Sequence, residues 1–203
     1  MGKSAGQDES RGASGAGIRL RVVGCGNAYA GDDSVGPEIV HRLRARGDCQ
    51  CELFEMPAAG VELLDLLQGA TVVLFIDAVS SGAPPGTMHL VSLPSSEIEP
   101  RALGSLSTHG WGLREVLELA EVLGRQTPRL MLLGVEVGTV APGAARTPAV
   151  EEAIQTVVEK FTQLRVLLTE VKQDEGRSFR RFLPGDLTFP RGGGEVPIAV
   201  GGQ

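Results

Sequence analysis

The sequence has few aromatic residues and few cysteines. Aromatic side chains make up 4% of its 203 residues, with one Tyr and one Trp, so aliphatic side chains must form the core. The three cysteines, Cys25, Cys49 and Cys51, are too few and odd in number for a disulfide framework, which favours a reducing, cytoplasmic environment. Cys49 and Cys51 also lack a second pair that would complete a structural zinc site.

The chain also lacks an excess of positive charge, a long apolar run and a secretion signal. Its formal net charge is −6, so we expect no basic surface for nucleic acid. No apolar run approaches the roughly 18 residues of a transmembrane helix, so we expect no membrane association. The polar N-terminus has no apolar segment of the kind found in a signal peptide.

Gly and other small or turn-forming residues concentrate at the two ends of the chain. Residues 1–16 are rich in Gly, Ser and Ala, and we expect them to form a disordered N-terminal tail. Residues 174–203 are rich in Gly and Pro and carry mixed charge, which predicts a flexible C-terminal tail. Residues 17–173 remain as one domain, long enough to bury a core of its own.

Strand-like and helix-like segments alternate through this domain. Apolar runs predict strands at 18–23, 51–56, 71–76, 87–93 and 129–137. Helical spacing of apolar residues, with caps and turn residues at the ends, predicts helices at 35–46, 61–67, 113–123 and 148–172. The alternation predicts an α/β fold of three αβα layers, in which helices cover both faces of a mostly parallel, twisted sheet of about five strands.

The loop GCGNAYAGDDSVG, residues 24–36, begins like a dinucleotide-binding loop but ends differently. Tyr29 stands where the fingerprint requires its third glycine, and Asp32 and Asp33 precede the helix. Two carboxylates at a helix N-terminus repel a pyrophosphate. The loop therefore favours presentation of a carboxylate at the carboxyl edge of the sheet, where open α/β sheets bind ligands. The alternative for Asp33 is a plain helix N-cap, and we expect Asp32 at the surface or in a cap.

Asp77 and His109 are the other residues that this edge could bring together with Asp33. Asp77 directly follows the continuous apolar run 71–76, and a charge in that position needs a partner. His109 ends the long predicted loop 94–110, in the segment STHGWG; a surface histidine is its alternative. Two carboxylates and one imidazole suit a borderline divalent ion such as Ni²⁺ or Zn²⁺, with coordination positions left open.

The remaining histidines and the nucleophilic side chains offer weaker sites. His41 should be solvated on a helix, and His89 should lie half-buried in a strand. Ser107 lies close to His109, but no G-x-S-x-G elbow supports a serine hydrolase. Cys25 lies in the glycine loop, yet no residue is marked as its base.

Five segments in this order resemble the hydrogenase maturation proteases: GCGNAYAGDDSVG, LFIDAV, STHGWGL, LLGVEVG and TPAVEEAI. The resemblance covers about residues 18–170 and leaves both tails outside it. Members of this family are endopeptidases that remove the C-terminal extension of the NiFe-hydrogenase large-subunit precursor. The resemblance therefore implies that this precursor is the partner of the chain. We expect the chain itself to act as a monomer.

The resemblance implies roles for the same three residues. Asp33, Asp77 and His109 are the implied ligands of nickel, which the precursor carries as a proofreading signal, and no other cofactor is implied. Asp33 and Asp77 are also the implied catalytic residues, through a metal-polarised carbonyl or an Asp-activated water. Two other classes stay open: a non-catalytic, nickel-dependent binding or chaperone module of the same fold, and a flavodoxin-like nucleotide binder.

Overall fold

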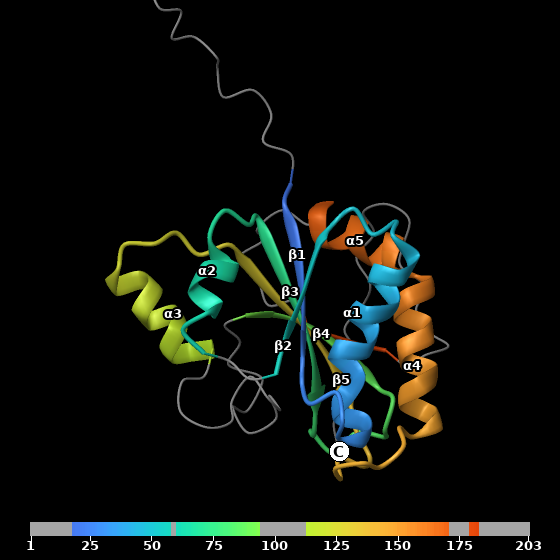
Figure 1. Cartoon of the computed structure of the whole chain (residues 1–203). Coiled ribbons are helices and arrows are strands. Elements are labelled where there is room, and N and C mark those ends of the chain that lie inside the picture. The colour runs from blue at the N-terminus through green and yellow to red at the C-terminus, as the bar shows by residue number, and fades with distance from the viewer. Residues whose placement is uncertain (1–17, 58–59, 94–112, 171–178, 183–203) are drawn as a thin grey trace, which may run out of the picture.

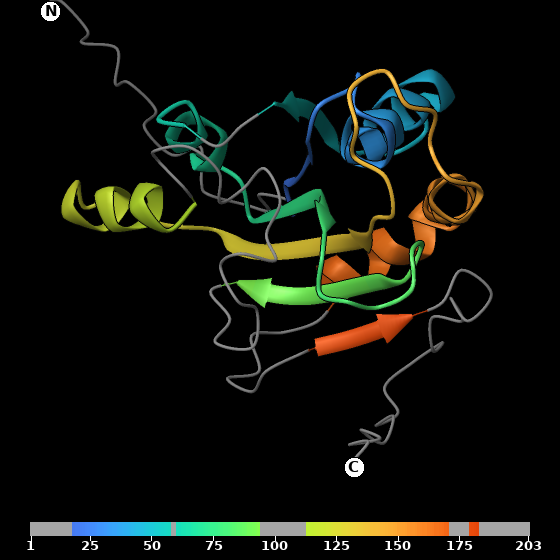
Figure 2. The ribbon, with the colours of Figure 1, turned by 90° about the horizontal axis from the view of Figure 1, so that it is seen from below.

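The computed structural model describes residues 18–57, 60–93, 113–170 and 179–182. Within these ranges six strands form one sheet in the order β2-β1-β3-β5-β4-β6 (Figure 1). The strands are β1 (Leu20–Cys25), β2 (Glu52–Met56), β3 (Val72–Val79), β4 (Met88–Leu93), β5 (Arg129–Glu136) and β6 (Phe179–Phe182). The strands β2, β1, β3 and β5 are parallel to one another, and β4 runs antiparallel to β5. The edge strand β6 pairs antiparallel with β4 and so points in the same direction as β5 (Figure 2). The predicted fold class is confirmed, and β6 is a strand that the sequence did not predict.

Helices cover both faces of this sheet. One face carries α1 (Val35–Arg46), α4 (Pro148–Glu159) and α5 (Phe161–Glu170), and the other carries α2 (Leu63–Leu67) and α3 (Leu113–Val122) (Figure 1). The single helix predicted over 148–172 is wrong, because the backbone leaves helical geometry at Lys160, with φ −97° and ψ 10°. The turn lets Phe161 bury against the sheet with only 1% of its surface exposed.

The sheet separates two aliphatic cores. Side chains that alternate along β1, β3 and β5 point to one face or the other, so each face has its own cluster. The cluster under α1 and α4 includes Ile39, Leu74 and Ile154; the cluster under α2 and α3 includes Leu63, Phe75 and Val116. No helix in the described ranges has the length and hydrophobicity of a membrane span.

The central strand β3 is longer than predicted. All eight of its residues are buried, and its pairing with β5 continues past Asp77, which lies opposite Gly134. The prediction that the strand stops before Asp77 is therefore wrong. The reason is the partner strand: β5 itself extends to Glu136, and the Val137 N–H donates to the Val79 carbonyl at 3.1 Å.

The first turn of α1 touches the ends of β1 and β3 backbone to backbone. A Cβ on Gly36 would overlap the carbonyl oxygens of Cys25 and Ile76 and lie 2.6 Å from the Cys25 nitrogen. A Cβ on Gly24 would in turn overlap the Gly36 carbonyl. These two glycines let the helix lie directly on the strand ends, and they place the preceding loop above the carboxyl edge of the sheet.

We expect Gly36→Ala to lower the free energy of unfolding by about 3 kcal/mol or more, because the added methyl meets rigid backbone atoms. Gly47→Ala is the control: Gly47 ends α1 with φ 72° and open space around it, so only backbone strain of about 1 kcal/mol should result. Urea unfolding of both variants measures the difference. Equal losses would show that the close approach at Gly36 is not tight.

Candidate active site

The carboxylate of Asp32 joins the loop after β1 to the loop after β5. Its side chain is fully buried and accepts hydrogen bonds from the backbone N–H groups of Gly138 (2.8 Å), Thr139 (3.0 Å) and Thr147 (2.6 Å) and from the Thr147 hydroxyl (3.0 Å). The Asp32 N–H donates back to the Thr139 carbonyl at 2.8 Å. The prediction of a surface or capping role for Asp32 near α1 is therefore wrong: its partners lie in a distant loop.

Hydrogen bonding decides the charge state of Asp32. Burial by itself raises the pKa of this carboxyl, but the donors at Thr139, Thr147 and Gly138 stabilise the anion more strongly. The net result is a pKa below the ordinary value. Asp32 is thus an ionised, internally satisfied anion at neutral pH.

Asp33 presents its carboxylate differently. It is half-buried within the 3₁₀ turn η1 (Gly31–Ser34), and its Oδ2 accepts the Asn27 N–H at 2.8 Å. Oδ1 of Asp33 has no hydrogen-bond donor within the described part of the chain, so its lone pairs are available to a ligand. The N-cap alternative is not what the structure shows, since α1 has Ser34 at its N-cap position and no side-chain capping bond.

Asp77 approaches the same strand end from β3. It is fully buried, and its Oδ1 accepts the Ala78 N–H at 2.9 Å. Burial and the nearby Asp77 carboxylate both raise the pKa of the Cys25 thiol well above its ordinary value. Gly24 lies opposite Ile76 in the parallel pairing of β1 and β3, so the next residues, Cys25 and Asp77, lie at the same level of the sheet. A Cβ on Gly26 would lie 3.5 Å from Oδ1 of Asp33. The two carboxylates thus flank the carboxyl end of β1, on the side where η1 packs against β3.

The third predicted ligand, His109, lies outside the described residues. Within the described ranges no group of three or more His, Cys, Asp or Glu side chains is arranged to hold a metal ion. Asp33 and Asp77 lie in the described part of the chain, and the assignment of all three residues as metal ligands stays a prediction. His41 is exposed on α1, as its helical position predicted.

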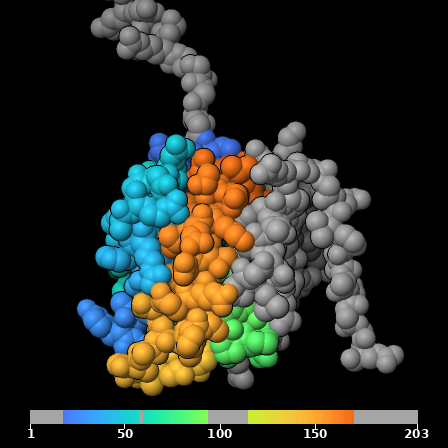
Figure 3. Space-filling model, turned by 90° about the vertical axis from the view of Figure 1, so that its right-hand side faces the viewer, coloured from blue at the N-terminus to red at the C-terminus, as the bar shows by residue number. Residues whose placement is uncertain are grey.

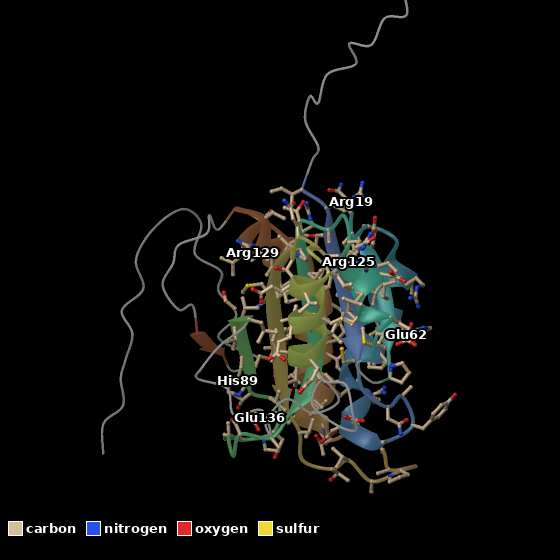
Figure 4. The ribbon with its side chains drawn as sticks, turned by 90° about the vertical axis from the view of Figure 1, so that its left-hand side faces the viewer. Arg19, Glu62, His89, Arg125, Arg129 and Glu136 are labelled. Atoms are coloured by element: carbon tan, nitrogen blue, oxygen red, sulfur yellow. The ribbon has the colours of Figure 1, made fainter. Side chains whose placement is uncertain are left out.

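A third buried acid lies further along the same sheet edge. Glu136 at the end of β5 is 1% exposed, and its Oε1 lies 3.0 Å from His89 Nε2. The Glu136 carboxylate also accepts hydrogen bonds from the Ser81 N–H at 3.1 Å and from the Ser81 hydroxyl. Figure 4 shows His89 and Glu136 together at the end of the sheet away from Arg19 and Arg129. Sequence analysis missed this cluster, although Glu136, like Asp77, directly follows a run of apolar residues. The acid lies between Ser81 and His89, so this is not a serine–histidine nucleophile pair.

The charge at this edge also bears on the nucleotide alternative. Asp32 and Asp33 occupy the turn directly before α1, and Asp33 retains an oxygen that faces no donor within the described ranges. A pyrophosphate at the α1 N-terminus would meet this carboxylate in place of free N–H groups. The site therefore favours a cation over a phosphate.

The fold and the acidic edge define an α/β protein with a carboxylate-lined site, and comparison with known proteins identifies the family. The model of the hydrogenase maturation protease family, HycI, matches residues 37–164. The chain belongs to the hydrogenase maturation protease family, as its sequence motifs predicted.

Relatives from several bacteria support this assignment. The hydrogenase expression/formation protein HupD of Thiocapsa roseopersicina is 34% identical over 145 residues, which cover 69% of this chain and 64% of the relative, just under two thirds of its length. The hydrogenase 2 maturation protease of Escherichia coli is 31% identical over 146 residues, covering 70% of this chain and 88% of that protein.

Solved structures agree with the observed fold. The hydrogenase maturating endopeptidase HybD from Escherichia coli aligns with a TM-score of 0.59 at 26% identity and covers 81% of this chain and 98% of that chain. The solution structure of an Escherichia coli endopeptidase aligns with a TM-score of 0.60 at 28% identity, over 83% of this chain and 99% of that one.

Replacing the buried anion should loosen both loops. We expect Asp32→Ala to lower the free energy of unfolding by about 3 kcal/mol at pH 7, because it removes the buried acceptor of four hydrogen bonds. Since the folded pKa of Asp32 is depressed, this contribution is present above its ordinary value of about 4 and is lost as the pH falls through the folded pKa. The difference in free energy of unfolding between wild type and Asp32→Ala, measured with urea, should therefore decrease as the pH is lowered.

Asp48→Ala is the control for Asp32→Ala. Asp48 is exposed and pairs with Arg46 at 2.8 Å, so its loss should cost about 0.5 kcal/mol or less. If Asp32→Ala were no more destabilising than Asp48→Ala, the Asp32 hydrogen bonds would not hold the loops.

The raised pKa of Cys25 gives a test of the cysteine-nucleophile alternative. A buried thiol that stays protonated at neutral pH is a poor nucleophile, so iodoacetamide at pH 7.5 should leave native Cys25 unmodified. Cleavage by Cys25→Ala should stay within about threefold of wild type, whereas removal of a true nucleophile costs orders of magnitude. Peptide mapping and a cleavage-rate measurement on unprocessed precursor check both points. Alkylation of folded protein with loss of cleavage would restore the alternative.

Proposed function

We propose that the chain is an endopeptidase that removes the C-terminal extension of a NiFe-hydrogenase large-subunit precursor after nickel has been inserted. Family membership supports the reaction class, and the observation that carries the assignment is the pair of carboxylates around the end of β1. The three cysteines are free thiols, which fits action in the cytoplasm. We expect the active species to be a monomer.

Nickel enters this proposal as part of the substrate. Asp33 supplies the accessible oxygen, because its Oδ2 is held by Asn27 while Oδ1 faces no described donor. Asp77 supplies a second carboxylate from the buried end of β3. His109 is the proposed third ligand, by its motif, and an O,O,N set suits a borderline divalent ion. A precursor without nickel offers no cation for these groups, so it would not be held in register for cleavage.

Hydrolysis of a peptide bond requires that one proton be removed from water and one be given to the leaving amine. In the proposed reaction the water oxygen attacks the scissile carbonyl carbon, and a carboxylate accepts the water proton. The same carboxyl then protonates the amine nitrogen as the C–N bond breaks. Asp77 is suited to this role, because its buried position holds it away from bulk water and beside the rigid end of β3.

The test is a cleavage assay on nickel-loaded and nickel-free large-subunit precursor, read by intact mass. The proposal predicts loss of a C-terminal peptide from the nickel-loaded form only. Tight binding of the loaded form without cleavage would favour the non-catalytic chaperone module. Equal cleavage of both forms would show that nickel is not the recognition signal.

Substitution of either carboxylate should stop processing while the fold is kept. We expect Asp77→Asn and Asp33→Asn to reduce the cleavage rate by about 100-fold or more, because general-base and charge contributions are of that size. Asp48→Asn, at an exposed carboxylate just beyond the C-terminal end of α1, should cleave at the wild-type rate. Cleavage by Asp77→Asn at the normal rate would contradict the assignment of this residue.

A further inference from the structure

Two exposed apolar side chains lie on the loops that border the site. Tyr29, the single tyrosine of the chain, is 84% exposed, and Val140 is 52% exposed. Tyr29 lies in the loop after β1, and Val140 lies in the loop between β5 and α4. Residues 27–29 and 138–143 are all exposed and none is charged, although 22% of the chain is charged. The two loops therefore form an uncharged surface on an acidic protein.

The backbone under this surface is firmly held. The Gly143 N–H donates to the Tyr29 carbonyl at 2.8 Å, and the Asp32 carboxylate binds the N–H groups of Gly138 and Thr139. Figure 3 shows the two segments side by side at one end of the molecule. A surface that is ordered before binding loses little conformational entropy when a partner docks.

The same loop connects this surface to the site. The Asn27 N–H donates to Oδ2 of Asp33, and the Asn27 side-chain oxygen accepts the Tyr29 N–H at 3.0 Å. Tyr29 and Asp33 are thus both hydrogen-bonded to Asn27. A protein whose scissile segment reaches Asp33 would bring its adjacent surface to Tyr29.

We propose that Tyr29 and Val140 form a docking surface for an apolar patch on the folded body of the precursor, beside its scissile segment. This inference rests on the proposed function. Few atoms surround a metal ion, so the carboxylates alone cannot distinguish one nickel protein from another, and protein specificity requires additional area. Tyrosine combines a large apolar contact with a polar tip and is enriched at the energetic centres of protein interfaces, from which charged side chains are depleted.

The experiment compares Tyr29→Ser and Val140→Ser with Val122→Ser. Val122 is 82% exposed at the end of α3, on the other face of the sheet, and serves as the matched control. With nickel-loaded precursor we expect KM to rise about tenfold for Tyr29→Ser and less for Val140→Ser, with kcat unchanged, because docking contacts are kept from ground state to transition state. Val122→Ser should keep both constants. Melting temperatures should not change, since all three side chains are exposed.

A binding titration gives a second readout that does not depend on cleavage. Because the docking surface does not involve nickel, Tyr29→Ser should also raise the Kd for intact, nickel-free precursor by about tenfold. An unchanged KM and Kd in Tyr29→Ser, a fall in kcat alone, or an equal effect of Val122→Ser would overturn the docking surface while wild-type cleavage upholds the proposed function. Tyr29-dependent binding without any wild-type cleavage would instead refute the protease and keep the surface. No binding of either precursor would refute both.

Discussion

The buried Asp32 anion is the interaction on which the arrangement of this edge depends. One carboxylate receives four hydrogen bonds from the loop between β5 and α4, and the Asp32 N–H returns one bond to the same loop. The donors are mostly backbone groups, so the attachment does not depend on the rotamers of long side chains. With the two loops joined, both Asp33 and the exposed Tyr29 have fixed positions relative to the sheet.

Adjacent acids in one motif therefore have opposite roles. Asp32 faces inward and its carboxylate accepts hydrogen bonds from protein donors, whereas Asp33 keeps an oxygen without a donor in the described ranges. The two side chains diverge within the turn η1, and the close approach of Gly36 to β1 and β3 follows directly after this turn. The same turn carries negative charge where a nucleotide-binding loop offers N–H groups, which disfavours a phosphate at this position.

Buried acids recur along the carboxyl edge, and each accepts hydrogen bonds there. Asp77 accepts the Ala78 N–H, and Glu136 holds Ser81 and His89 at the point where β3 and β4 are linked. Asp77 was predictable, because a charge that follows an apolar run stands out in the sequence. Glu136 gives the same signal but was overlooked. The role of Asn27 could not be predicted, because its hydrogen bonds to Asp33 and Tyr29 depend on the path of the loop.

The sequence by itself determined the alternation of elements, the α/β class, the acidic loop and the family, since these depend on local periodicity and on short motifs. Tertiary structure decided what lies far apart in the chain: the extension of β3 along β5, the break at Lys160 that buries Phe161, and the pairing of β6 with β4. It also decided which of two neighbouring aspartates turns inward. That choice follows from donors more than a hundred positions away, at Gly138, Thr139 and Thr147, which no local pattern around Asp32 can reveal.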